Sequence, residues 1–271
     1  MATALRWRSF LFIASLPIIA VVVACAPGSD RRTAPKVFLY GDSILYEAKP
    51  ALQRASREEN LTGISVRATP GFAPCDWTDR IRHDLEATPR AVAVVETVGN
   101  SWTSCMFDRG RRVEPGSPAF YRRYTRDLER IADLAARNDA KLVFLTPFPV
   151  ASPTFNSVLE RIAAIERRTA ASRAGRISVS NALTGAVARS GTYAQRLPCL
   201  PSETPAMGCS GGTIPVREPT GLHLCPTGYA SVNDVFRGCP VYSSGAERFA
   251  KALTRLVERA LNDRSPASGS T

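Results

Sequence analysis

A serine stands where an apolar run of the chain gives way to a segment with helical periodicity. Residues 36–40 form the run, and Gly41-Asp42-Ser43 follows it directly. If the run is a strand and a helix starts at once, Ser43 lies at the carboxyl edge of a sheet, beside the N–H groups of a helix N-terminus. Those donors stabilise a developing oxyanion, so Ser43 is a candidate nucleophile. The alternative is a helix N-cap serine in a turn, without a catalytic role.

A serine hydroxyl becomes an effective nucleophile only when a base takes its proton. Histidine suits that task near neutral pH, and the chain has two histidines, His83 and His223. His83 lies in a charged helical stretch, residues 79–85, where we expect a surface position. His223 lies in a loop before the last predicted helix, which makes it the candidate base. The alternative for His223 is a structural loop histidine.

Four short segments occur in a fixed order, each near the end of a predicted strand or in the final loop. They are Gly41-Asp42-Ser43, Thr69-Pro70-Gly71, Thr97-Val98-Gly99-Asn100 and Gly221-Leu222-His223-Leu224. In combination they resemble the four blocks of the SGNH (GDSL) hydrolases, and the resemblance covers roughly residues 36–261. It implies an ester hydrolase or acyltransferase without a cofactor. It also implies an oxyanion hole made by the backbone N–H groups of Ser43 and Gly71 and the side-chain amide of Asn100.

One position departs from the family pattern. SGNH hydrolases carry an aspartate three residues before the histidine, and here that residue is Thr220. Threonine can accept a hydrogen bond from imidazole but cannot offset its positive charge, and a triad without a working carboxylate can lose about 10⁴ in turnover. The site is then a Ser–His dyad supported by Thr220, or Glu218 supplies the carboxylate. Otherwise the protein is a weak or inactive relative that binds an envelope glycan or lipid.

A second serine matches a different catalytic pattern. Gly208-Cys209-Ser210-Gly211-Gly212 spells the G-x-S-x-G nucleophile motif, which requires a strand before the serine and a helix after it. Ser210 lies instead among prolines and cysteines. We therefore do not predict a nucleophile at Ser210.

Strand-like and helix-like segments alternate along the chain. The predicted strands are short apolar runs without a clear alternation, at residues 36–40, 64–67, 91–98, 141–145 and 176–180. Such runs are typical of strands buried on both faces of a parallel sheet. Helical stripes fill the gaps, with helix starts at Ser117-Pro118 and near Ser243-Ser244. This alternation predicts an α/β fold, and the resemblance makes it a three-layer α/β/α sandwich with a five-stranded parallel sheet, flavodoxin-like in topology. Residues 190–242 show no clear periodicity.

The N-terminal segment predicts export. Arg6 and Arg8 precede an apolar run, residues 10–23, of signal-peptide length. The end of the run and the two residues after it, Val22-Val23-Ala24-Cys25, resemble a bacterial lipobox. We therefore expect a lipoprotein signal peptide at 1–24, a lipidated Cys25 and a flexible tether at 25–35. A domain at 36–262 and a disordered tail at 263–271 follow, and the protein is expected on the outer face of the cell membrane. The alternatives are an ordinary signal peptide and an uncleaved anchor.

Six cysteines remain if Cys25 carries lipid, and an even number in an exported protein predicts disulfides. They can pair in many ways, and the sequence does not choose among them. Pairing of neighbours along the chain gives the bonds that we expect, Cys75–Cys105, Cys199–Cys209 and Cys225–Cys239. A zinc site is disfavoured because no C-x-x-C pair exists and histidines are scarce.

A net charge of +11 raises the question of nucleic-acid binding. The basic residues are spread through predicted helices and alternate with acids, which is typical of solvated helix faces. We expect no nucleic-acid partner, with weak attraction to an anionic envelope polymer or membrane as a second possibility, and a monomer.

Segments around Trp77, Trp102 and Cys239 resemble SGNH proteins of actinobacteria. The two tryptophans either form sugar-stacking walls of a cleft or pack internally, and the expected substrate is a small acyl ester on an envelope glycan or lipid.

Overall fold

The computed structural model describes residues 36–173, 175–219, 221–227 and 239–263. The predictions for the signal peptide, Cys25, the tether, Thr220 and residues 264–271 lie outside these ranges. Asp263, which begins the predicted tail, caps the last helix and accepts a hydrogen bond from Lys141 Nζ at 2.8 Å. Within the described part of the chain, no helix combines the length and apolarity needed to cross a membrane.

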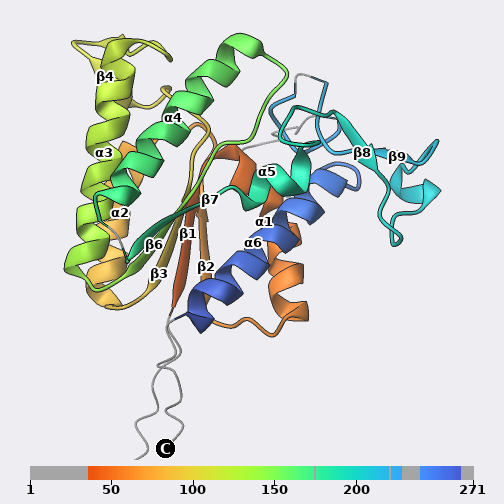
Figure 1. Ribbon diagram of the computed structural model, residues 1–271, viewed down its shortest axis with the longest axis horizontal. Coiled ribbons are helices and arrows are strands. Elements are labelled where there is room, and N and C mark those ends of the chain that lie inside the picture. Colours follow the sequence, from red (N-terminus) through yellow and green to blue (C-terminus); the bar gives the residue numbers. More distant parts are fainter. Residues whose placement is uncertain (1–35, 174, 220, 228–238, 264–271) are drawn as a thin grey trace, which may run out of the picture. The chain divides into compact units, whose positions relative to one another are not determined.

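A five-stranded parallel sheet forms the centre of the domain, as predicted (Figure 1). Its order is β2-β1-β3-β6-β7, with β1 Val37–Gly41, β2 Ile64–Ala68, β3 Val92–Glu96, β6 Lys141–Leu145 and β7 Ile177–Ser180. Every residue of β1 and β3 is buried, because helices cover both faces of the sheet. Leu39 pairs with Val66 on one side and Val94 on the other. The strand order therefore reverses at β1, where β2 and β3 lie on opposite sides.

Two groups of helices cover the sheet. The helices are α1 Ser43–Glu58, α2 Pro74–Ala87, α3 Pro118–Arg137, α4 Pro153–Ala171, α5 Ala182–Val187 and α6 Ser244–Asn262. On one face α1 and α5 pack against α6, and on the other α3 packs between α2 and α4 (Figure 1). The predicted starts at Ser117 and Ser243 are confirmed, since each serine caps its helix by accepting a backbone N–H with its side chain. These layers form an α/β/α sandwich.

The region without clear periodicity contains a small hairpin of its own. Strands β8 Arg196–Pro198 and β9 Thr213–Pro215 pair antiparallel and bury Leu197, Ile214 and Val216 in a satellite core. The buried carboxylate of Glu203 bonds the Ser244 hydroxyl and, at 2.8 Å, Arg248, which attaches the hairpin region to the start of α6. The remaining short elements are the 3₁₀ turns Ser104–Met106 and Pro205–Met207 and the strands β4 Phe107–Asp108 and β5 Arg111–Arg112.

All three predicted disulfides are present. Cys75–Cys105 joins the start of α2 to the segment after β3, Cys199–Cys209 closes the region between β8 and β9, and Cys225–Cys239 lies before α6.

Candidate active site

Helix α1 begins with the candidate nucleophile. Asp42 is the N-cap, its Oδ1 accepts the backbone N–H of Ile44 at 3.1 Å, and Ser43 is the first helical residue. The exit from β1 is tight because Glu96 Oε2 accepts the backbone N–H of Asp42 at 3.2 Å. A Cβ on Gly41 would lie 2.7 Å from that oxygen, so only glycine fits there. The turn therefore places Ser43 at the carboxyl edge of the sheet, where the strand order reverses.

The Asp42 side chain links the ends of β1 and β3. Its Oδ2 accepts the Val98 backbone N–H at 2.9 Å and the Asn100 amide at 2.8 Å. The same amide nitrogen donates to the Phe72 carbonyl at 3.3 Å, next to Gly71. The structure thus brings together the three loops on which the predicted oxyanion donors lie. Both N–H groups of Asn100 are engaged, so donation to an oxyanion requires release of the longer bond to Phe72.

Burial raises the pKa of Asp42 from 3.8 to about 6, although the N–H groups of Ile44 and Val98 oppose the shift. The folded protein holds this proton more tightly than the unfolded chain does. The contribution of Asp42 to stability therefore falls as the pH rises from 3.8 to about 6. Above that range the ionised carboxylate accepts the Asn100 amide and fixes its orientation.

The carboxylate beside the His223 ring is Glu47, not Glu218. His223 Nδ1 contacts Glu47 Oε1, while the other carboxylate oxygen of Glu47 accepts the backbone N–H of Leu224 at 2.6 Å and of Cys225 at 3.3 Å. The Glu47 side chain is fully buried, and that of His223 is 18% exposed. Glu218 is bonded to the His223 backbone, with its Oε1 accepting the N–H at 3.3 Å. Glu218 therefore shapes the loop, and the acid comes from α1.

The Glu47 contact changes the basicity of the imidazole. Burial lowers the pKa of His223, but the hydrogen bond and negative charge of Glu47 outweigh it, and Glu218 and Asp42 add to the rise above 6.5. A charged imidazole is therefore stabilised in this position. That is the requirement for a base that must hold a proton during a reaction.

Ser43 and Glu47 are four residues apart in α1, so their side chains project from the same side of the helix. Glu47 engages Nδ1 of the histidine, which directs Nε2 away from the carboxylate. One helix thus fixes the candidate nucleophile Ser43 and the carboxylate of Glu47, and a distant loop brings His223 to that helix.

Arg217 anchors this loop, a role that no sequence pattern predicts. Its guanidinium is fully buried and lies 4.0 Å from the Phe148 ring. Nη1 donates to the carbonyls of Gly221 at 2.9 Å and Pro149 at 3.2 Å, and Nη2 donates to that of Val187 at 3.1 Å. Burial lowers the pKa of Arg217 to about 10. One side chain therefore joins the histidine loop to the segments that follow β6 and end α5.

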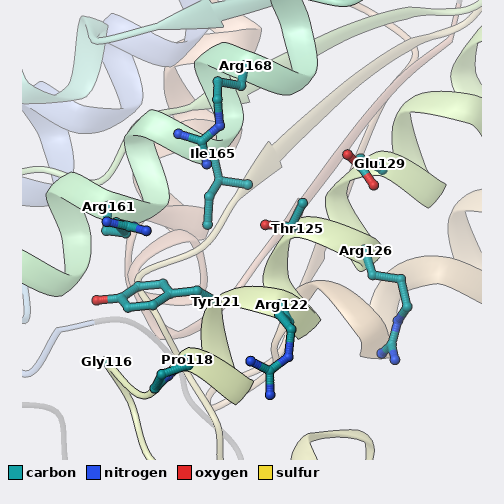
Figure 2. A pocket seen from close by; sticks show the side chains of 10 residues that line it. All are labelled: Gly116, Pro118, Tyr121, Arg122, Thr125, Arg126, Glu129, Arg161, Ile165 and Arg168. Atoms are coloured by element: carbon teal, nitrogen blue, oxygen red, sulfur yellow. The ribbon is translucent and has the colours of Figure 1, made fainter.

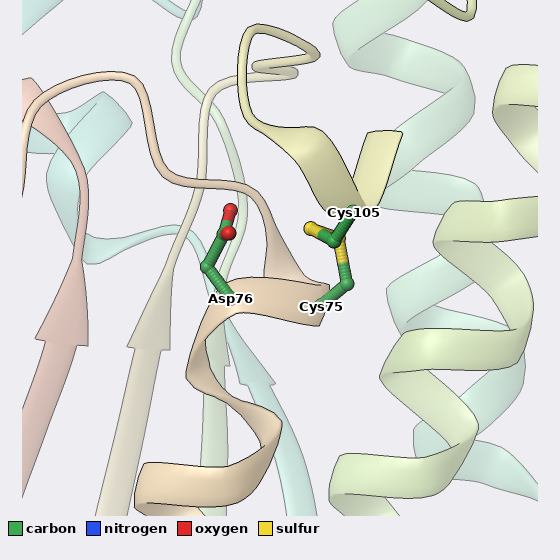
Figure 3. A group of neighbouring side chains, drawn as sticks. All are labelled: Cys75, Asp76 and Cys105. Carbon is green, nitrogen blue, oxygen red and sulfur yellow. A yellow bond between two sulfur atoms is a disulfide. The ribbon is translucent and has the colours of Figure 1, made fainter. Parts of the chain in front are cut away.

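A second connection holds the loops after β2 and β3. Figure 3 shows Asp76 beside the Cys75–Cys105 disulfide. Asp76 Oδ2 accepts the Ala73 backbone N–H at 2.8 Å and the Thr103 hydroxyl at 2.7 Å. Because both sulfurs are covalently paired, this cluster does not offer thiolate ligands to a metal ion. It fixes the segments that carry Gly71 and Asn100.

The two tryptophans differ in their surroundings. Trp77 is buried against Tyr40 and Phe72, so it is a packing residue and not an exposed wall of a cleft. Trp102 is 67% exposed, with the Arg112 guanidinium 3.9 Å above its ring, and its binding role stays a prediction.

Two further residues, His83 and Ser210, lie where the sequence predicts. His83 is exposed on α2. Ser210 is exposed and bridges to Thr213 in the turn of the hairpin, without the strand–helix setting of a nucleophile. Gly71 has a φ of +79°, a conformation that favours glycine, and its role as an oxyanion donor stays a prediction.

Fold and site together define a doubly wound α/β protein with serine, histidine and a buried glutamate gathered at the reversal of strand order. The chain belongs to a family described as "Protein of unknown function (DUF459)", whose sequence profile matches residues 36–237.

Solved structures similar to the chain include a GDSL-like lipase from Bacteroides thetaiotaomicron, with 13% identity and a TM-score of 0.49 over 85% of this chain and 89% of that one. Another is the psychrotrophic esterase EstA from Pseudoalteromonas, with 10% identity and a TM-score of 0.46 over 84% and 98%. No curated protein matches the sequence. The assignment of an activity therefore rests on the geometry of the site.

Proposed function

We propose that this protein is a serine-dependent esterase or acyl-transfer enzyme of the SGNH type, with Ser43 as nucleophile, His223 as base and Glu47 as the orienting acid. The contact between His223 Nδ1 and the buried Glu47 carboxylate carries the proposal. It holds the base against the helix that starts with Ser43. It also supplies the negative charge that the threonine at position 220 cannot supply.

In the proposed reaction, His223 Nε2 takes the Ser43 hydroxyl proton while Oγ attacks the ester carbonyl carbon. Glu47 stabilises the imidazolium, and the oxyanion is met by the N–H groups of Ser43 and Gly71 and by the Asn100 amide once it leaves Phe72. The imidazolium then gives its proton to the departing alkoxide, leaving an acyl-Ser43. Water or a sugar hydroxyl then loses a proton to His223 and attacks the acyl carbon. The bond from that carbon to Ser43 Oγ breaks, His223 returns the proton to Oγ, and an acid or a new ester leaves.

The buried acid favours an enzyme over an inactive binding module. Burial of a carboxylate is costly unless it is paired and hydrogen-bonded. Glu47 meets that requirement with one imidazole and two backbone N–H groups of the same loop. The strongest reason to expect an inactive protein was the lack of a carboxylate near His223, and Glu47 removes it.

The proposed substrate is a small acyl ester on an envelope glycan or lipid. The exposed ring of Trp102 suits a substrate that arrives from solvent. Export and attachment through Cys25 would place the enzyme beside such material.

Reaction with a fluorophosphonate ester tests the nucleophile directly, because this reagent phosphonylates activated serines. We expect one adduct per protein, and mass spectrometry of proteolytic fragments should place it on Ser43. Prior denaturation should abolish labelling, since an isolated serine is not activated. An adduct on Ser210, or none on the folded protein, contradicts the proposal.

The Cys75–Cys105 bond is expected to support both stability and turnover. It closes a loop with a sequence separation of 30 residues, and replacing both cysteines by serine should lower the free energy of unfolding by about 3.5 kcal/mol. Turnover should fall as well, because the bond fixes the loops of Gly71 and Asn100. Denaturant unfolding and p-nitrophenyl acetate hydrolysis measure the two effects. The Cys199→Ser/Cys209→Ser control should also lose stability, but it should keep its turnover at temperatures where it is folded. Equal turnover of the two variants would contradict a role of the Cys75–Cys105 bond in fixing the loops of Gly71 and Asn100.

A further inference from the structure

A basic groove of about 690 Å³ lies between α3 and α4, the helices that cover one face of the sheet (Figure 2). Arg122 and Arg126 line it from α3, and Arg161 and Arg168 line it from α4. Glu129 is the one acid among the described residues that line it. The groove therefore carries an excess of positive charge.

Three of the four arginines have no acidic partner in the described part of the chain. Arg126 pairs with Asp127, with 2.9 Å between Nε and Oδ1. Arg122, Arg161 and Arg168 form no ion pair with any described carboxylate, and all three are exposed. An unpaired guanidinium presents a planar set of donors that matches carboxylate and phosphate oxygens. The groove thus offers anion-binding groups that no internal acid uses.

The spacing of these charges fits an extended ligand. Arg161 and Arg168 are seven residues apart on one helix, which separates them by about 10 Å along its axis, and Arg122 and Arg126 are about 6 Å apart. A single ion would touch only part of this array. A chain with repeated negative charges can meet all of it, with the Tyr121 ring and buried Ile165 below.

One end of the groove lies at the start of α3. Its lining includes Gly116 and Pro118 at the start of α3, and a helix that follows a parallel strand starts at the edge where the strands end. The segment from Asn100 to Gly116 spans the distance between the site and the groove, and it carries the Trp102–Arg112 pair. A polymer in the groove would extend toward the edge that holds Ser43.

We propose that this groove binds a linear polyanion and that this polymer is the acyl-bearing substrate; the second part rests on the proposed function. A polymer fits better than a membrane surface because the charges line a recess between two helices, which a flat bilayer would not enter. The groove then selects acylated anionic polymers over neutral ones.

Polygalacturonate, with or without O-acetyl groups, is a suitable probe. The groove variant is Arg122→Gln/Arg161→Gln/Arg168→Gln. The matched control is Arg57→Gln/Lys251→Gln/Arg255→Gln, which removes the same charge from exposed positions on α1 and α6. Binding is measured in a Ser43→Ala background by calorimetry at several salt concentrations, so that it does not depend on turnover. We expect affinity for polygalacturonate to fall about tenfold or more in the groove variant, with a weaker salt dependence, and to stay within about twofold in the control.

Activity measurements distinguish a failure of the groove proposal from a failure of the proposed esterase function. The groove variant should hydrolyse p-nitrophenyl acetate at the wild-type rate but show a raised KM for O-acetylated polygalacturonate. Equal loss of binding in both triple variants would mean that net charge alone attracts the polymer, and the groove site would be refuted. Groove-dependent binding to phosphatidylglycerol vesicles without binding to polygalacturonate would also overturn it. Polymer binding with no hydrolysis of any ester by the wild type would leave the groove standing and refute the catalytic proposal.

Discussion

Replacement of Glu47 by glutamine is expected to lower kcat for ester hydrolysis by up to about 10⁴-fold, the loss seen when a triad carboxylate becomes an amide. Glutamine has nearly the same shape, and its oxygen can still accept the Leu224 or Cys225 N–H that Glu47 accepts. It cannot balance a charged imidazole, and its NH₂ group can face Nδ1 and impose the wrong tautomer. Steady-state kinetics with p-nitrophenyl acetate measure the effect, with little change expected in KM.

The pH profile of the same variant reports on the interaction itself. His223 must be neutral to act as a base, and its raised pKa places the acid limb of kcat/KM above pH 6.5 in the wild type. Removing the Glu47 charge removes the largest upward contribution, so the acid limb should move to lower pH. Glu58→Gln is the control, since Glu58 is exposed on the same helix. An unchanged rate and profile in Glu47→Gln would show that Glu47 does not support the base.

The Ser43→Ala variant is expected to lose more, about 10⁶-fold in kcat, because removing a catalytic serine abolishes the covalent pathway. The fold should be unaffected, since Asp42 caps α1 and alanine is a good helix former. Thermal unfolding should therefore show a transition close to that of the wild type. Hydrolysis measured with p-nitrophenyl acetate should fall to the small residual rate that substrate binding and the oxyanion donors support without the serine.

Ser210→Ala provides the matched control, because Ser210 lies in the competing G-x-S-x-G sequence. That variant should keep full activity, as its serine is exposed in a hairpin turn. Activity retained in Ser43→Ala, or lost in Ser210→Ala, would exclude the serine mechanism proposed here.

Local sequence patterns were sufficient for the sheet and for much of the site. All five strands lie where short apolar runs occur. In β1 and β3 every residue is buried, because helices cover both faces of the sheet there. The edge strands β2 and β7 are partly buried and also carry polar residues. The positions of Ser43 and Asn100 could also be predicted, because residues that follow parallel strands lie at the carboxyl edge of the sheet. The hairpin of β8 and β9 was missed because its strands have only three residues each, too few to show a period.

The acid of the site was missed for a different reason. A glutamate in a helix is usually a solvated residue, whereas Glu47 lies in a stripe with Ile44, Ala48 and Ala51, all of which are buried. A charge within the apolar stripe of a helix, four residues after a candidate nucleophile, is the signal that would have identified it. Arg217 gave no such signal, because its partners are backbone carbonyls from three separate segments.

The placement of Ser43 and Glu47 on one helix has a consequence for how activity is lost. Their relative positions are set as soon as α1 forms, whereas His223 arrives from 176 residues further along the chain than Glu47. Local opening of the histidine loop costs less free energy than global unfolding, because it leaves the sheet and the helices intact. On warming, the protein should therefore pass through a folded state without the proposed activity, in which the backbone amides of Leu224 and Cys225 exchange with solvent. Cooling should restore activity without refolding, since the serine and the acid would never have separated.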